Sequence, residues 1–234
     1  MTTNDKGLRA FCLALLGCVL AACGQPGGSA GPAASAPGAA FTANLKPLPG
    51  HEADAPKLTR KATVRMQTTG GEVVIDVFPE AAPNAAKRFL ELVTSGFYDD
   101  TPVSRVVPGF VAQFGVNWRE PHKAWKDKTF DDDPTYFALE RGTLAFAKGP
   151  PNSNSTQVFI NFAQNNRLAD PRYNFTVFGE VVSGMDVVDK FVRVGDPSYG
   201  LDQDRLWQDG GAYLDSLAEK PTMIQHAAVV GAAR

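Results

Sequence analysis

The sequence contains very little cysteine. Of its three cysteines in 234 residues, Cys12 and Cys18 fall in an N-terminal apolar stretch, and Cys23 follows that stretch. If the residues before Cys23 are removed, the remaining chain has one thiol and forms no intramolecular disulfide. We therefore expect a fold that its buried core holds together without covalent cross-links.

Long apolar runs are also lacking. The N-terminal run, residues 11–20 (FCLALLGCVL), follows Lys6 and Arg9 and is too short to span a bilayer as a helix. This pattern is typical of a secretion signal, and we expect residues 1–22 to be removed. Cys23 follows Leu-Ala-Ala, which resembles a bacterial lipobox and implies cleavage before Cys23 and acylation of that residue. An ordinary signal peptide that happens to contain cysteine is the alternative.

Acylation of Cys23 would decide where the protein resides. Several acyl chains anchor a protein firmly, because each buried CH₂ contributes roughly 0.8 kcal/mol. Gly24, rather than aspartate, follows the cysteine. By resemblance to lipoprotein sorting in enterobacteria, this favours the outer membrane. The expected location is the periplasmic side of the cell envelope, with a lipid anchor at Cys23.

Strong charge of either sign is absent. The chain has 23 basic and 25 acidic residues and no run of lysine or arginine, which excludes the basic footprint of a nucleic-acid-binding protein. C-x-x-C, P-loop and H-E-x-x-H motifs are missing too. Residues 131–133 (DDD) lack the spacing of an EF-hand, so we expect a solvated loop there and no metal.

The composition changes near residue 61. Residues 23–61 are rich in glycine, alanine, serine and proline, which predicts a flexible tether that begins at the lipidated Cys23. Residues 62–234 show the patterns of one folded domain. We expect strands at 64–68 and 73–78, on both sides of Pro108-Gly109, and at 144–147, 157–161, 176–182 and 223–230. With helices at 83–96 and 185–192, this predicts a mainly β fold, a closed antiparallel eight-stranded barrel capped by two helices.

Residues 104–113 (SRVVPGFVAQ) form the most informative segment. They place Arg105, Phe110 and Gln113 at fixed offsets in a short apolar stretch. Further motifs follow in matching order at 96–99 (GFYD), 142–147 (GTLAFA), 151–160 (PNSNSTQVFI) and 177–188 (VFGEVVSGMDVV). Together they resemble the cyclophilins, the family of peptidyl-prolyl cis-trans isomerases. The order of the expected strands and helices matches the cyclophilin barrel.

The resemblance implies an enzyme that speeds rotation about Xaa-Pro bonds without a cofactor. Arg105 is expected to donate to the proline nitrogen of the twisted amide, because a guanidinium is always charged, planar and multi-donor. Gln113 and Phe110 are the other expected catalytic residues; Gln113 would hold the substrate carbonyl. The expected substrate-binding residues are Phe146, Ala147, Gln157, Phe159, Leu168 and Phe175. Phe110, Phe159 and Leu168 would form the pocket for the proline ring, with Phe175 at its edge. Phe146, Ala147 and Gln157 would line the neighbouring groove for the residues that precede proline.

Several positions depart from the family pattern. Ser104 replaces a histidine, Phe114 replaces a glycine, and Arg167 stands where the animal enzymes have a tryptophan. Residues 193–220 exceed the usual connection before the last strand. These departures leave open a non-catalytic peptide-binding or assembly module that uses the same groove. A lipoprotein whose barrel binds a small apolar ligand is a third hypothesis.

The expected partners follow from the location and the resemblance. They are proline-containing peptides, unfolded exported proteins, and the membrane through Cys23, with no nucleic acid. We expect the chain to be a monomer.

Overall fold

The computed structural model describes residues 41–232. The predicted signal sequence, Cys23 and the first part of the predicted tether lie outside these residues, so those expectations stay predictions. Within residues 41–232, no helix combines the length and the apolar character needed to cross a bilayer.

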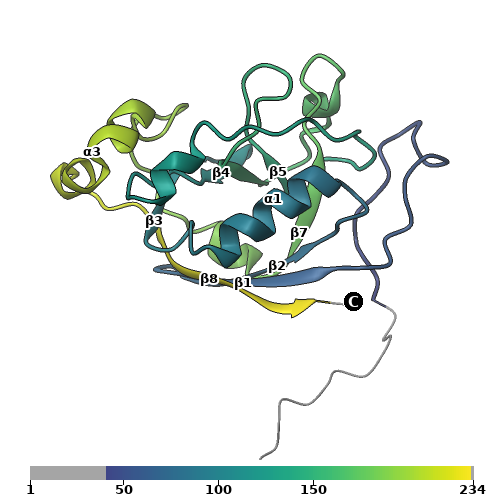
Figure 1. Cartoon of the computed structure of the whole chain (residues 1–234), viewed down its shortest axis with the longest axis horizontal. Coiled ribbons are helices and arrows are strands. Elements are labelled where there is room, and N and C mark those ends of the chain that lie inside the picture. The colour runs from purple at the N-terminus through teal and green to yellow at the C-terminus, as the bar shows by residue number, and fades with distance from the viewer. Residues whose placement is uncertain (1–40, 233–234) are drawn as a thin grey trace, which may run out of the picture. The chain divides into compact units, whose positions relative to one another are not determined.

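The strands form a closed barrel with antiparallel neighbours, which confirms the predicted mainly β fold (Figure 1). Around the barrel the order is β1-β2-β7-β5-β6-β4-β3-β8. The strands are β1 (Ala62–Thr68), β2 (Gly71–Val77), β3 (Thr101–Val107), β4 (Val111–Phe114), β5 (Thr143–Phe146), β6 (Val158–Asn161), β7 (Val177–Ser183) and β8 (Met223–Ala232).

Both predicted helices are present. Helix α1 (Pro83–Thr94) has proline in its first turn, and Gly96 follows its end with a φ of 68°, a conformation that glycine adopts without strain. The second, α2 (Met185–Val188), is shorter than the predicted range of 185–192. Two short 3₁₀ turns, η1 (His122–Trp125) and η2 (Asn166–Ala169), lie in the long loops.

The insertion at residues 193–220 contains a third helix, α3 (Gln203–Ser216), which the sequence pattern does not indicate. Figure 1 shows α3 at the side of the barrel. Asp202 caps it by accepting a hydrogen bond from the Arg205 amide at 3.0 Å. Gly210 lies so close to the Trp118 ring that a Cβ would sit 2.2 Å from it. The Gly-Gly pair that permits this approach also weakens the helical signal in the sequence.

The strands divide their side chains between two apolar clusters. Alternate residues of a strand point to opposite faces. Ala112, Leu144 and Ile160 belong to the larger cluster, to which all eight described strands contribute and which fills the barrel. Their neighbours, Val111 and Ala145 among them, belong to a second cluster on the outer face. Most of the residues expected to form the site lie on this outer face.

Residues 41–61 correct the predicted extent of the tether. Phe41 stacks on Phe78 with ring centroids 5.9 Å apart, and Leu45 is buried in the outer cluster. Pro47 pairs with Phe137 in a β-bridge. The segment therefore packs against the barrel, because its few large apolar side chains are spaced to reach the outer cluster. The prediction of a flexible tether now concerns only residues 23–40, which lie outside the described residues.

Candidate active site

Neighbouring strands place the expected catalytic residues in one row. Arg105 on β3 lies opposite Gln113 on β4, and Gln113 lies opposite Phe159 on β6. Phe159 in turn lies opposite Ala145 on β5. Because directly opposed residues of an antiparallel sheet share a face, the row brings the predicted arginine, glutamine and phenylalanine together on the outer face of the barrel.

A chain of hydrogen bonds runs along this row. Arg105 Nε donates to the Ser198 carbonyl oxygen at 2.7 Å, and Arg105 Nη1 donates to Gln113 Oε1 at 3.2 Å. Gln113 Nε2 then donates to Gln157 Oε1 at 2.8 Å. An arginine has five N–H donors, so these two contacts orient the guanidinium and leave donors for a substrate.

Arg105 is only half-buried, and its surroundings are mainly apolar. Its Cζ lies 5.6 Å from the centroid of the Phe110 ring. Burial lowers the pKa of Arg105, and the nearby Tyr199 opposes this shift. A guanidinium nevertheless stays charged at physiological pH. The site therefore presents a permanent cation in a partly dry environment, where its field is stronger than in water.

The Ser198 contact comes from the insertion. Asp196 Oδ1 accepts hydrogen bonds from the amides of Ser198 and Tyr199, at 2.7 and 2.9 Å, which closes a tight turn. Gly200 has a φ of 75°, and a Cβ there would lie 2.3 Å from the Ser104 carbonyl oxygen. The turn at 196–200 thus packs directly on β3 beside Arg105. No pattern in the sequence indicates this contact, which joins residues 93 positions apart.

The outer apolar cluster adjoins the row. Four residues predicted to form or border the proline pocket belong to it: Phe110, Phe159, Leu168 and Phe175. Phe159 and Phe175 meet edge to face, with ring centroids 5.6 Å apart. The Phe175 amide donates to the Leu168 carbonyl oxygen at 3.0 Å, which ties the loop wall to η2. The structure therefore brings these predicted pocket residues together.

The predicted groove residues separate into two groups. Ala147 joins the outer cluster, and its amide donates to the Gln157 carbonyl oxygen at 2.8 Å. Phe146 is only 3% exposed and packs inside the barrel against Phe130 and Phe178. It belongs to the opposite face from Ala147 because successive strand residues alternate. The structure does not bring Phe146 to the groove, contrary to the expectation.

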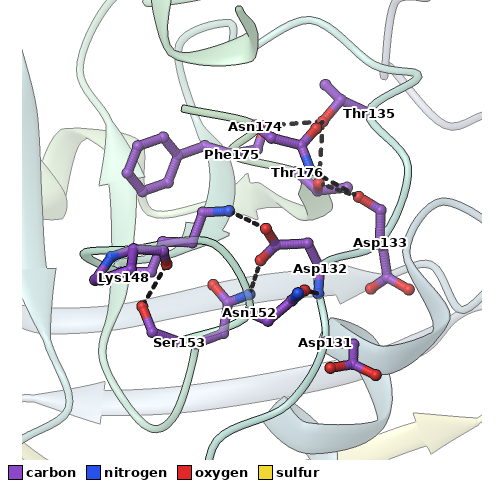
Figure 2. Close-up of polar contacts among 12 residues, drawn as sticks. Asp131, Asp132, Asp133, Thr135, Lys148, Asn152, Ser153, Asn174, Phe175 and Thr176 are labelled. Atoms are coloured by element: carbon purple, nitrogen blue, oxygen red, sulfur yellow. Dashed lines mark hydrogen bonds and ion pairs between the residues drawn. The ribbon is translucent and has the colours of Figure 1, made fainter. Parts of the chain in front are cut away.

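A buried ion pair lies beside Phe175 (Figure 2). Lys148 and Asp132 form it with side chains only 2% and 11% exposed. Asn154 Nδ2 donates to Asp132 Oδ1 at 2.7 Å, and Lys148 Nζ lies 5.7 Å from the centroid of the Phe175 ring. The expectation of a solvated loop at residues 131–133 holds for Asp131, which is exposed, and is wrong for Asp132 and Asp133. Lys148 supplies a buried partner for Asp132 that the local sequence does not reveal.

The next acidic residue, Asp133, joins the same loop to helix α1. Its carboxylate accepts hydrogen bonds from the Asn84 and Ala85 amides at 3.1 and 2.9 Å. Burial raises the pKa of Asp133, and the two amides oppose this shift. On its other side, the Asp133 carbonyl oxygen accepts from the Thr176 hydroxyl at 2.9 Å, close to Phe175 (Figure 2). Asp133 thus connects helix α1 with the segment that contains Phe175 and Thr176.

The geometry suits one kind of chemistry. A fixed cation and an amide side chain adjoin a cluster of apolar side chains, and the row itself offers no nucleophile beside a base. Such a site stabilises a change in the charge distribution of a bound group without making or breaking a covalent bond.

Comparisons with known proteins agree with this interpretation. The profile of the family "Cyclophilin type peptidyl-prolyl cis-trans isomerase/CLD" matches residues 63–206. A peptidyl-prolyl cis-trans isomerase of Acinetobacter baylyi is 39% identical over 146 residues, covering 60% of this chain and 77% of the relative. Peptidyl-prolyl cis-trans isomerase B of Escherichia coli is 37% identical over 150 residues, covering 60% of this chain and 90% of the relative.

Solved structures support the fold. A cyclophilin-type isomerase of Cryptosporidium parvum has a TM-score of 0.55 at 21% identity and covers 73% of this chain and 98% of its own. A second structure of that protein, determined in the presence of the dipeptide Ala-Pro, has a TM-score of 0.53 at 22% identity and covers 72% of this chain and 99% of its own. At these identities the likeness concerns the fold alone. Taken with the family profile and the bacterial relatives, it shows that the chain belongs to the cyclophilin-type peptidyl-prolyl cis-trans isomerases.

Proposed function

We propose that this isomerase acts on Xaa-Pro bonds of exported proteins, with Arg105 stabilising the twisted amide and the apolar pocket holding the proline ring. The observation that carries the proposal is the position of the Arg105 guanidinium. Ser198 and Gln113 orient it at the edge of the cluster that contains Phe110 and Phe159. Family membership favours catalysis over the two alternatives, a binding module and a carrier of apolar ligands.

The size of the catalytic task follows from the uncatalysed barrier. Rotation about an Xaa-Pro bond has a barrier of about 20 kcal/mol, because the amide is conjugated. A turnover of about 10³ per second corresponds to a barrier of about 13 kcal/mol. An efficient isomerase therefore lowers the barrier by roughly 7 kcal/mol.

Arg105 supplies part of this reduction. In the twisted amide the nitrogen becomes pyramidal and basic, so it accepts a hydrogen bond that the planar amide does not accept. A charge-assisted hydrogen bond of this kind contributes about 1.5–3 kcal/mol. We attribute the remainder to the pocket, because a twisted amide is less polar than a planar one and loses less on leaving water. Gln113 would donate its second Nε2 hydrogen to the substrate carbonyl while the other side of the bond rotates.

The test compares three variants in cis-to-trans exchange of a short Xaa-Pro peptide, followed by NMR. Arg105→Ala should lower kcat/KM by about 10- to 100-fold, which corresponds to the loss of one charge-assisted hydrogen bond. Arg105→Lys should fall in between, since an ammonium keeps the charge without the planar fork. Arg65→Ala is the matched control, because Arg65 is exposed on β1 and pairs with Glu72. Full activity of a folded Arg105→Ala variant would contradict the role given to Arg105.

The cellular part of the proposal rests on the sequence before residue 41. The short apolar run and the Leu-Ala-Ala-Cys motif support export and acylation at Cys23. In a bacterial host fed radiolabelled palmitate, the wild type should carry the label and fractionate with membranes. Cys23→Ala should lose both properties, whereas Cys18→Ala should keep them. Labelled Cys23→Ala, or an unlabelled and cleaved wild type, would contradict the lipid anchor.

A further inference from the structure

A second guanidinium lies at the pocket. Arg167, on η2, has its Cζ 5.2 Å from the centroid of the Phe110 ring, and Arg105 has its Cζ 5.6 Å from the same centroid. The next residue along the chain, Leu168, belongs to the pocket wall. Arg167 itself is exposed. Stacking on an aromatic ring restricts the orientation of a guanidinium while its N–H edge stays open to solvent.

Within the described part of the chain, no acidic side chain neutralises the charge of Arg167. Among residues 41–232, no carboxylate forms an ion pair with it. Asp170, three positions further on, is engaged by Arg172 through contacts of 2.9 and 3.0 Å, and these contacts lower the pKa of Asp170 to about 2. Asp196, near Arg105, accepts hydrogen bonds from the amides of its own turn.

The strand register gives the pocket two ends. Val111 of β4 pairs with Asn161 of β6 at one end, and Phe114 pairs with Val158 at the other. Gln157 and Ala147 lie at the Val158 end, since one precedes β6 and the other follows β5. Phe110 precedes β4 and lies at the Asn161 end, where its carbonyl oxygen accepts from the Phe162 amide at 2.9 Å. Arg167, stacked on Phe110, is therefore at the end opposite to Gln157 and Ala147.

The proposed function places the residues before proline in the groove at Ala147 and Gln157. The residue after proline would then extend over Phe110 toward Arg167. We propose that Arg167 is a specificity-determining residue that favours an acidic side chain directly after the proline. A guanidinium receives a carboxylate through two parallel hydrogen bonds, which a glutamine or a lysine of the substrate does not offer. This inference rests on the pocket assigned under the proposed function.

The test uses three peptides that differ only in the residue after proline: Ala-Ala-Pro-Glu, Ala-Ala-Pro-Gln and Ala-Ala-Pro-Lys, each with blocked termini. For the wild type at low salt, kcat/KM should be about three- to fivefold higher for the Glu peptide than for the Gln peptide, as expected for an exposed charge pair. Arg167→Gln should bring this ratio close to one, and Arg167→Glu should reverse the order in favour of the Lys peptide. Added salt should reduce the wild-type preference.

The control is Arg65→Gln, which removes the same charge from β1 and should keep the wild-type ratio. A ratio near one in the wild type, an unchanged ratio in Arg167→Gln, or a lost ratio in Arg65→Gln would each overturn the proposal. If the wild type turned over none of the peptides, the proposed function would fail. The preference would then be measured as peptide affinity in NMR titrations, with the same variants and the same criteria.

Discussion

Two loops lie beside the outer apolar cluster, and each contributes an aspartate to a pair of opposite charges in close contact. Lys148 and Asp132 have side chains 2% and 11% exposed, whereas Arg172 and Asp170 have side chains 77% and 36% exposed. Breaking a buried pair leaves a charge without water or partner, which is strongly destabilising. An exposed pair exchanges its partner for solvent at little cost. We infer that burial, rather than the presence of an ion pair, decides which of the two loops its ion pair stabilises.

The strongest test of this contrast removes the buried cation. Lys148→Ala should lower the free energy of unfolding by about 3–5 kcal/mol, because Asp132 remains buried and unpaired. Urea unfolding followed by circular dichroism measures the change. The double variant Lys148→Met, Asp132→Leu removes both charges and should recover most of the loss. A loss well below about 1 kcal/mol in the single variant would place this pair with the exposed ones.

A second variant asks whether a buried contact without charge has a comparable effect. Gly200→Ala places a Cβ 2.3 Å from the Ser104 carbonyl oxygen, at a φ of 75°. The turn must shift, so the free energy of unfolding should fall by about 1–3 kcal/mol. The activity should fall with it, because the Ser198 contact to Arg105 is disturbed.

Gly211→Ala is the matched control for this variant. It adds the same methyl group in α3, where the nearest atom is 3.8 Å away. The control should keep both stability and activity, since an alanine is favoured over glycine in a helix. If the two variants had the same stability and activity, the close approach of the turn at 196–200 to β3 would contribute to neither.

The two loops should also differ in how their contributions to the free energy of unfolding change with pH. Burial raises the pKa of Asp133 above its ordinary value of 3.8. The contribution of this group to stability is therefore fully present below that value and is lost as the pH rises through the folded-state pKa. The variant Asp133→Asn keeps the shape of the side chain and supplies a reference that does not titrate. The unfolding free energy of the wild type relative to this variant should fall as the pH rises from about 4 toward neutrality, and a constant difference would contradict it.

The smallest effect is expected in the exposed loop. Arg172 lowers the pKa of Asp170 to about 2, so this pair stabilises above the ordinary value of 3.8 and loses its effect as the pH falls through about 2. Both side chains are exposed, and solvent screens the interaction. Arg172→Gln should therefore raise the pKa of Asp170 in an NMR titration and leave the urea midpoint at neutral pH unchanged. A midpoint shift like that of Lys148→Ala would remove the contrast between the loops.

Much of the row of expected catalytic residues could be predicted from the sequence. Arg105, Phe110 and Gln113 lie within nine residues, and their offsets are set by a hairpin whose geometry is local. The pocket residues Phe159 and Leu168 follow the same logic, since the motif order matches the order of the strands. Phe146 departs from the prediction because the motif alone ignores the two-residue period of its strand, which turns Phe146 inward and Ala147 outward.

The supports of the site could not be predicted in this way. Lys148 and Asp132 are 16 positions apart in irregular loops, and nothing in their spacing specifies that they meet. Phe41 and Leu45 lie in a stretch whose composition resembles a linker, and only the outer cluster of the folded barrel gives them a partner. Such contacts depend on the closed barrel, so they become visible only after the strands are placed.

The Ser198 contact positions Arg105 in a way that does not depend on which side chains the turn carries. Because a main-chain oxygen holds the guanidinium, any residue that keeps the turn provides the same acceptor. The adjacent Tyr199 is 76% exposed and projects from this turn. Substitutions at this tip could therefore diversify the clients of related enzymes during evolution while the geometry of Arg105 is inherited unchanged.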